Sequence, residues 1–238
     1  MQKIDNWFYQ DIRETTSTND AVQEVLKKVQ APCILTAYHQ TKGRGRLTRQ
    51  WQSLKGNLFA SFAYRIIPQN LGQMVILSGL AVAETVQFFL PSEHIEVKWP
   101  NDVLVEGKKI SGILFEKAFD DFWVMGIGIN VCHAPLLENT LYQATSFSDF
   151  GILSDREKVL RVLIKKFDFL KEQYESKGFS LIKKTWLDKA YNHGKKVCIL
   201  QNGNIKTGIF EDLDHDGALI LKTDIGYERI IVGDLFNG

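Results

Sequence analysis

A long cationic loop between two β-rich segments is the feature that most restricts the fold of this chain. The loop runs from Gln40 to Trp51, and segments 33–38 and 57–64 on either side read as strands. Within it, glycines alternate with cationic residues, in the order Lys42, Gly43, Arg44, Gly45, Arg46, and then Arg49. Glycine lets a backbone approach a ligand closely, and arginine presents a planar fork of donors that fits phosphate or carboxylate. Because long loops in compact domains are usually functional, we expect an anion-binding loop on a sheet.

The charge distribution supports a small anionic ligand. The chain has 238 residues and a net charge of only +1, with 45% hydrophobic and 24% charged residues. This is the balance of a globular protein with a proper core, large enough for one large and one small domain. No acidic residue lies between Glu24 and Glu84, whereas this interval carries eight lysines and arginines. A cationic patch on an otherwise mildly acidic chain suits a small anion better than a nucleic acid or a membrane.

Cysteine usage and the N-terminus indicate a cytoplasmic protein. Cys33, Cys132 and Cys198 are odd in number and far apart, and they form no CxxC motif. A disulfide framework or a zinc site is therefore not expected, and a reducing cytosol is the natural compartment. We expect no signal peptide, because no apolar stretch follows the first residues, and no membrane span.

Periodicity predicts an α+β fold with flanking helices. Helical spacing begins at Ser17 and recurs over 73–89, 156–174 and 179–191. Further strands are expected at 95–99, 103–105, 109–117 and 122–131, and an irregular crossing at 133–151. This order indicates a mixed or antiparallel sheet. From Lys195 the period changes to two, with turn signals that predict a small β-barrel. We place the domains at 1–191 and 192–238.

Three clusters carry the right chemistry to converge on one site. The loop offers Arg44, Arg46 and Arg49, and a hairpin offers Lys109. The turn at 98–102 offers the cation Lys98, the amide Asn101 and the carboxylate Asp102. Cations together with a carboxylate that could bind a metal ion are typical of a nucleotide-binding site. An amide side chain can both donate to and accept from the edge of an adenine base. Each cluster has an ordinary alternative, since basic glycine-rich loops also bind RNA and Pro-Asn-Asp is a common turn. Ser17 and Thr18 could equally be a helix N-cap.

Taken together, the motifs resemble one family. They are residues 17–19 (STN), 40–46 (QTKGRGR) with Trp51, 98–102 (KWPND), 109–114 (KISGIL) with Glu116, and 126–130 (GIGIN). The chain resembles the biotin protein ligases, which adenylate biotin and attach it to a lysine of a carrier domain. The resemblance runs from about Asp11 to the C-terminus. It implies a class II synthetase-like catalytic domain followed by a small SH3-like barrel.

The resemblance also implies roles for individual residues. Positions that match biotin-binding positions are Ser17, Thr18, Asn19, Gln40, Gly43, Gly45, Lys109, Gly112, Leu114 and Gly128. Positions that match ATP- or adenylate-binding positions are Arg44, Arg46, Arg49, Trp51, Asn101, Lys109 and Asn130. Among these, Gly112 and Gly128 would let the apolar tail of biotin lie close to the strands. Lys109, Arg44 and Arg46 would act on the reacting groups, and Asp102 would orient the incoming lysine or a metal. No residue is assigned as a metal ligand.

The implied reaction has two steps. Biotin and MgATP give biotinyl-adenylate, which a lysine of the biotin carboxyl carrier protein of acetyl-CoA carboxylase then attacks. The chain departs from the family pattern at Leu47-Thr48, where many members have Arg-Gly, so loop closure over phosphate is expected to differ. We expect a monofunctional ligase without the N-terminal DNA-binding domain, and hence no sequence-specific DNA binding. A homodimer is compatible with the family.

Three rival functions stay open from the sequence, and one of them is a ligand-gated interaction protein that binds biotin without catalysis. A lipoate-protein ligase would share the fold and the adenylation chemistry, although the full set of motifs favours biotin. A non-catalytic nucleic-acid-binding module could use the basic loop and the small barrel. Its weak points are the near-zero net charge and the shortage of aromatic residues among the basic ones.

Overall fold

One mixed sheet forms the centre of the larger domain in this computed structural model, which describes residues 1–238 apart from 48, 137–142 and 202. Among the described residues eight strands pair in the order β1-β2-β3-β4-β8-β7-β6-β5. They are β1 (Gln2–Ile4), β2 (Trp7–Thr15), β3 (Cys33–Gln40), β4 (Leu58–Arg65), β5 (Ile95–Lys98), β6 (Asp102–Val105), β7 (Lys108–Lys117) and β8 (Phe122–Ile129). Only the β2–β3 pair is parallel, within the described part of the chain. The predicted α+β class with a mixed sheet is confirmed.

The first two strands were missed by the sequence reading, which assigned no element before Ser17. In β2, burial alternates over Trp7, Phe8 and Tyr9, and the strand then becomes mostly exposed. The alternation is therefore too short to stand out. β2 reaches the sheet only through its parallel pairing with β3, a contact between segments about 25 residues apart.

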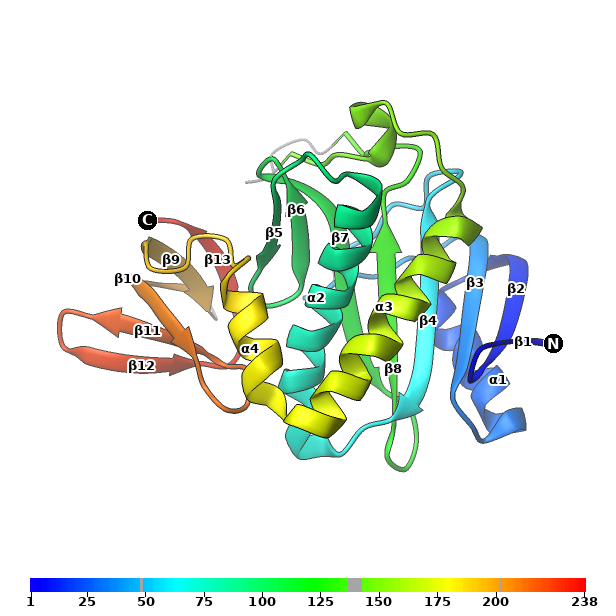
Figure 1. The fold of residues 1–238 in the computed structure, drawn as a ribbon, viewed down its shortest axis with the longest axis horizontal. Coiled ribbons are helices and arrows are strands. Elements are labelled where there is room, and N and C mark those ends of the chain that lie inside the picture. Colours follow the sequence, from blue (N-terminus) through cyan, green and yellow to red (C-terminus); the bar gives the residue numbers. More distant parts are fainter. Residues whose placement is uncertain (48, 137–142, 202) are drawn as a thin grey trace.

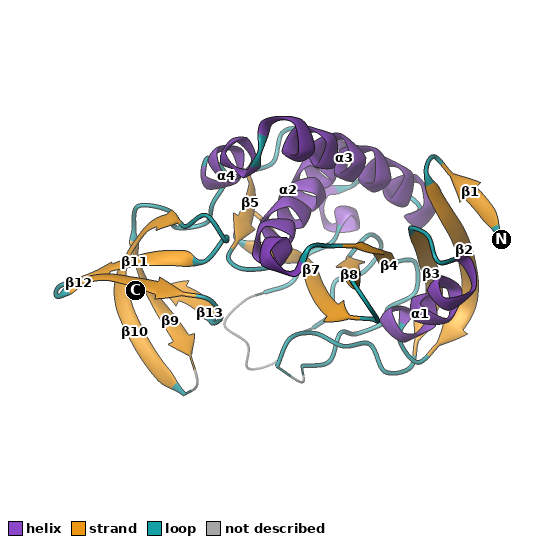
Figure 2. Ribbon diagram, turned by 90° about the horizontal axis from the view of Figure 1, so that it is seen from below, coloured by secondary structure: helices purple, strands orange, loops and turns teal. Residues whose placement is uncertain are grey.

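Helices cover both faces of the sheet in three layers (Figures 1 and 2). Helices α2 (Leu71–Phe89), α3 (Arg156–Lys177) and α4 (Phe179–Leu187) lie on one face, and α1 (Thr18–Val29) lies on the other. Helix α2 is long and apolar enough to cross a membrane, which was not expected from the sequence. Most of it is buried against the sheet and the neighbouring helices, as in the core helix of a globular domain.

The alternation of β8 determines which face can hold a ligand. Met125, Ile127 and Ile129 join the main core under α2, whereas Val124 joins the smaller core under α1. Since successive side chains of a strand point to opposite faces, Gly126 and Gly128 lie on the α1 face with Val124. Their missing side chains leave room above the sheet there, and the cationic loop crosses this same face.

The C-terminal domain is an antiparallel sheet of five described strands, in the order β12-β11-β10-β9-β13. They are β9 (Lys196–Gln201), β10 (Asn204–Leu213), β11 (Leu219–Thr223), β12 (Gly226–Ile230) and β13 (Asp234–Asn237). The predicted small β domain is confirmed, but its ladder is open, because β12 and β13 are its two edges. It is fixed to the larger domain by bonds such as Trp99 Nε1 to the Gly217 carbonyl oxygen, 3.2 Å apart.

Candidate active site

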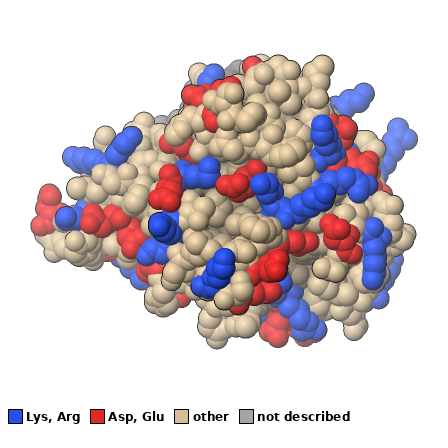
Figure 3. Space-filling view, in the orientation of Figure 1, with Lys and Arg blue, Asp and Glu red and all other residues tan. Residues whose placement is uncertain are grey.

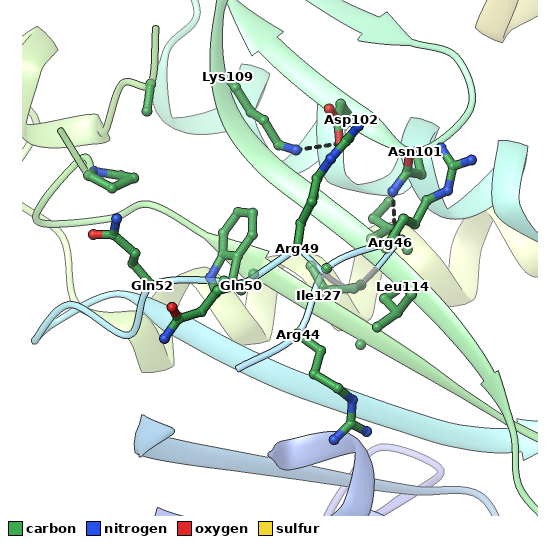
Figure 4. Close-up of a pocket in the computed structure, with 18 of the residues that line it drawn as sticks. Arg44, Arg46, Arg49, Gln50, Gln52, Asn101, Asp102, Lys109, Leu114 and Ile127 are labelled. Carbon is green, nitrogen blue, oxygen red and sulfur yellow. Dashed lines mark hydrogen bonds and ion pairs between the residues drawn. The ribbon is translucent and has the colours of Figure 1, made fainter. Parts of the chain in front are cut away.

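A cavity of about 480 Å³ lies on the α1 face of the sheet, at the junction with the C-terminal domain. Figure 4 shows the loop arginines and the strand residues around it. Every predicted site residue except Gly43 lines it: Ser17, Thr18, Asn19, Gln40, Arg44, Gly45, Arg46, Arg49, Trp51, Asn101, Asp102, Lys109, Gly112, Leu114, Gly128 and Asn130. The structure therefore brings together residues that are up to 113 positions apart in the sequence.

One end of the cavity is built from neutral polar groups. The Gln40 Oε1 atom accepts hydrogen bonds from the Thr18 backbone N (2.8 Å) and from Thr18 Oγ1 (3.1 Å). Ser61, on β4, donates from its Oγ to Asn19 Oδ1 at 2.6 Å and lies 2.8 Å from Thr18 Oγ1. Ser17 occupies the N-cap position of α1, but its side chain makes no capping hydrogen bond. Ser17 therefore occupies the N-cap position, but its hydroxyl does not cap the helix. The hydroxyl is instead buried beside the cavity.

Asn19 connects this neutral end to an ion-pair cluster at the rim. Its Nδ2 donates to Glu116 Oε2 at 2.6 Å, and its side chain fills the space above Gly126. Arg44 pairs with Glu116 at 3.0 Å and with Asp20 at 2.7 Å. The hydrogen bond from Arg44 lowers the pKa of the Asp20 carboxyl. Figure 4 shows the Arg44 side chain directed away from Lys109 and Asp102, so its predicted action on the adenylate remains a prediction.

The cationic loop folds back on itself and seats Trp51 on the sheet. The Trp51 backbone N donates to the Gly43 carbonyl oxygen (3.0 Å), and the Gly45 N donates to the Arg49 carbonyl oxygen (2.7 Å). The Trp51 indole lies directly over Gly128, where an added Cβ would overlap the ring, and 3.0 Å from the Cβ position of Gly112. The indole therefore occupies the space above these two glycines, which the sequence reading assigned to the biotin tail. Its Nε1 is buried without a partner among the described residues.

The cation and carboxylate predicted at the reacting centre form an ion pair. Lys109 Nζ lies 2.7 Å from Asp102 Oδ1 across the β6–β7 hairpin. Next to them, the Asn101 Nδ2 donates to the Ile113 carbonyl oxygen at 2.6 Å, and its Oδ1 accepts from Arg46 at 3.1 Å. Both polar atoms of the Asn101 side chain are thus engaged within the protein. A role for this side chain on adenine would require that one of these bonds be exchanged.

Two further charged residues complete the site: Lys98, which the sequence offered as the cation of the 98–102 turn without a specific role, and Asp234, which the sequence reading did not assign. Lys98, the last residue of β5, is 4% exposed, and burial lowers its pKa to about 7. Asp234, the first residue of β13, pairs with Arg49 and lies 4.0 Å from Arg46. Arg46 also donates to the Gly233 carbonyl oxygen at 3.3 Å. The KWPND motif marks Lys98, whereas the role of Asp234 depends on contacts with a distant part of the chain.

The other predicted residues support the walls. Asn130 is 2% exposed, and its Nδ2 donates to the Thr145 carbonyl oxygen at 3.0 Å. Gly43 lies under the Trp51 carbonyl oxygen, which would be 2.5 Å from an added Cβ. Leu47 has a positive φ of 52° and is exposed, and Thr48 lies outside the described residues, so the effect of this departure from the family pattern stays a prediction.

Comparison with known proteins gives consistent results over both domains. Residues 11–130 match the biotin/lipoate A/B protein ligase family, and residues 193–236 match the biotin protein ligase C-terminal domain. A biotin–[acetyl-CoA-carboxylase] ligase of Paracoccus denitrificans is 30% identical over 95% of this chain and 99% of that protein. One of Mycobacterium tuberculosis is 33% identical over 84% of this chain and 76% of its own length.

The structural comparison agrees. The biotin protein ligase of Aquifex aeolicus, solved in complex with biotin and ATP, superposes with a TM-score of 0.83 at 31% identity, over 96% of this chain and 97% of that one. On these matches of sequence and structure, the chain belongs to the biotin/lipoate A/B protein ligase family.

Proposed function

We propose that this protein is an ATP-dependent biotin protein ligase that forms biotinyl-adenylate and transfers biotin to a carrier lysine. The observation that carries the choice of biotin is the neutral end of the cavity. Thr18, Asn19 and Gln40 place buried hydrogen-bonding groups there, and Ser61 of β4 bonds to Thr18 and Asn19 from behind. A urea ring carries N–H donors and a carbonyl acceptor that can exchange hydrogen bonds with such groups, whereas a dithiolane ring carries neither. The curated relatives are named as biotin ligases, which supports the same choice.

Adenylation then takes place at the Lys109–Asp102 pair. A carboxylate oxygen of biotin attacks the α-phosphorus of ATP, the bond to the bridging oxygen breaks, and pyrophosphate leaves. The fixed ammonium of Lys109 stabilises the negative charge that develops on the α-phosphate oxygens. In the second step the neutral ε-amine of the carrier lysine attacks the acyl carbon, AMP leaves, and the amine loses a proton. No side chain of this protein needs to form a covalent bond.

The residues present fit a magnesium ion that arrives with ATP. Mg²⁺ keeps several waters and takes phosphate oxygens with one or two carboxylates as ligands. Asp102 and Asp234 are the carboxylates among the described residues that line the cavity. Of these, Asp102 would hold the ion, which supplies charge neutralisation at the phosphates when bound.

The partners follow from the proposed reaction. The acceptor is a lysine-bearing carrier domain of a biotin-dependent carboxylase. We also propose a cytoplasmic location and no sequence-specific DNA binding, which a gel shift with a biotin-operon operator would test. On the face seen in Figure 3, acidic and basic side chains are interspersed, and this does not favour a nucleic-acid surface there. The homodimer stays a prediction for measurement by light scattering.

Exchange of labelled pyrophosphate into ATP tests the proposal. Exchange is expected with biotin and not with lipoate. Exchange with lipoate alone would identify the protein as a lipoate ligase. If folded protein shows exchange with neither substrate, the ligase assignment is wrong.

A further inference from the structure

The backbone of Lys109 is held on one side by a segment that does not belong to the sheet. β8 pairs with β7 only as far as Ser111, and Lys109 lies beyond the end of this pairing. Instead, the Lys109 N donates to the Gln143 carbonyl oxygen at 2.8 Å. The Lys109 carbonyl oxygen accepts from the Thr145 N at 2.9 Å. The position of Lys109 on this side of β7 therefore depends on the segment 143–145.

Two buried asparagines connect this segment to the end of β8. Asn130 directly follows β8, and its N donates to the Ile110 carbonyl oxygen at 2.9 Å. Its Nδ2 donates to the Thr145 carbonyl oxygen at 3.0 Å. Asn57, which directly precedes β4, lies with its Nδ2 3.4 Å from Asn130 Oδ1. Both asparagines are buried, so water does not replace these bonds, and the contacts form a path from Asn57 to Lys109.

The side-chain oxygen of Asn57 accepts from three successive backbone donors. They are the N atoms of Val131 (3.0 Å), Cys132 (2.9 Å) and His133 (3.1 Å). The Asn57 Nδ2 donates to the His133 carbonyl oxygen at 2.7 Å. One amide thus fixes the path of the chain directly after Asn130, because backbone donors that leave the sheet need another acceptor. Asn57 itself does not line the cavity.

We propose that Asn57 is a positioning residue for adenylation, which acts on Lys109 through Asn130 and the segment 143–145. The inference rests on the proposed function, in which Lys109 stabilises the charge that develops on the α-phosphate. A cation is effective there only if the protein holds it in place before the reaction. Without Asn57, the donors of 131–133 lose their shared acceptor, and the contacts that hold the Lys109 backbone loosen. A displacement of about 1 Å can lower a rate by about 100-fold.

Single-turnover formation of biotinyl-adenylate in Asn57→Ala tests the proposal. At saturating biotin and MgATP the rate should fall by about 10–100-fold. The Kd for biotin, measured by calorimetry without ATP, should change less than about twofold, because other elements build the neutral end. In a Lys109→Ala background, Asn57→Ala should also cost less than about twofold, because the cation through which Asn57 acts is gone. Equal losses of rate in the two backgrounds would overturn the proposal and leave Asn57 a structural role only.

Amide hydrogen exchange at Lys109 and Thr145 gives a second measurement that needs no activity. Both N–H groups should exchange at least about tenfold faster in Asn57→Ala, because the contacts around them open more easily. Unchanged exchange at both amides would overturn the proposal. Faster exchange in a protein that forms no biotinyl-adenylate would refute the ligase function and support the link between Asn57 and Lys109.

Two further variants separate positioning from a loss of stability. Asp168→Ala removes the acceptor of Trp7 Nε1, whose bonds to the two carboxylate oxygens measure 3.0 and 3.2 Å, away from the cavity. It should lower the Tm and leave the adenylation rate within about twofold of wild type. Asn57→Asp keeps an oxygen for the three backbone donors and loses only the Nδ2 donor, so its rate should lie between those of wild type and Asn57→Ala. If Asn57→Ala does not fold, Asn57→Asp takes its place in the double-mutant cycle and the exchange measurement, and wild-type values in both would overturn the proposal.

Discussion

The two ends of the cavity are constructed differently. At the neutral end, Thr18, Gln40 and Ser61 are buried and joined by hydrogen bonds between α1, β3 and β4 of one domain. At the charged end, ion pairs join the loop to β13 across two domains, and the Arg49 side chain is largely exposed. A network of buried neutral bonds is already organised for its ligand. Exposed ion pairs are weaker, are screened by salt, and can exchange partners with an incoming phosphate.

This contrast suggests a division of labour. Under the proposed function, the neutral end would select the substrate by the direction of its donors and acceptors, and the charged end would accommodate the pyrophosphate that leaves during the reaction. Substitutions at the neutral end should therefore act on biotin alone, and substitutions at the charged end on the nucleotide. The Lys109–Asp102 pair stands between the two ends, where the proposed reaction would bring both substrates together.

Lys109→Ala should produce the largest effect, because it removes the cation at the reacting phosphate. We expect the rate of adenylate formation to fall by about 10²–10³-fold or more, as for the loss of one donor to a developing anion. Single-turnover formation of biotinyl-adenylate measures it. Lys108→Ala is the control on the same hairpin, since its exposed side chain does not line the cavity. Normal exchange in Lys109→Ala would mean that the cation lies elsewhere.

Gln40→Glu should raise the KM for biotin by about 10–100-fold, as expected when a buried donor becomes an unpaired acceptor. The substitution keeps an oxygen for the two bonds from Thr18 and replaces only the side-chain nitrogen. The KM for ATP should not change. Gln10→Glu on β2, away from the cavity, controls for the added charge. An equal rise in the KM for biotin and the KM for ATP would contradict the assignment of the two substrates to different ends of the cavity.

Lys98 should make pyrophosphate binding depend on pH in a predictable direction. Its pKa of about 7 lies below the unfolded value, so the amine loses its proton above pH 7 and stops attracting phosphate. The ratio of the wild-type Kd to that of Lys98→Arg should be flat below pH 7 and rise above it, by up to about tenfold per pH unit. Taking the ratio at each pH cancels the titration of pyrophosphate itself. A flat ratio up to pH 9 would contradict this prediction, because Lys98 would then stay charged or make no contact with the phosphate.

Gly128→Ala should weaken adenylate binding by about tenfold, because the new methyl group would displace Trp51 from its seat. Trp51→Ala provides the background that separates the two interpretations of this glycine. If Gly128 is needed only to make room for the indole, Gly128→Ala should weaken adenylate binding little further once Trp51→Ala has removed the ring, as a double-mutant cycle would show. If Gly128 instead makes room for the biotin tail, the losses of adenylate affinity from the two substitutions should add. Adenylate dissociation rates measure both.

The sequence predicts which residues lie at the site better than it predicts their contacts. Lys109, Asp102 and Arg46 were found because each stands in a motif with a recognisable spacing, and all three lie at the site. Asp234 was missed, because its role depends on a contact between residues 185 positions apart in two domains. Trp51 was assigned to adenine binding. Its packing over Gly112 and Gly128 could not be predicted, because it depends on the sheet register that places these two glycines opposite each other.

The fold shows the same limit. The helices with long apolar faces and the β6–β7 hairpin were predicted at nearly the right bounds, because their signals are local. β1 and β2 were not predicted, since β2 is held by parallel pairing with β3 rather than by its own pattern. The small β domain was predicted from its period of two and its turn signals, whereas its strand order, β12-β11-β10-β9-β13, could not be predicted because strand order is not encoded in periodicity.

Substitution of Arg44 should have the smallest effect on the adenylation rate. It tests whether Arg44 belongs to the charged end of the cavity. Its exposed pairs with Asp20 and Glu116 brace the rim near the neutral end, and each contributes at most about 1 kcal/mol. If these pairs persist during turnover, Arg44→Gln should change the adenylation rate by less than about threefold. Arg46→Gln, whose side chain is 18% exposed and bridges to β13, should release adenylate markedly faster. Stopped-flow release and single-turnover rates for the two variants decide the question. A loss in Arg44→Gln as large as that in Arg46→Gln would mean that Arg44 leaves its carboxylates during catalysis and closes over the adenylate.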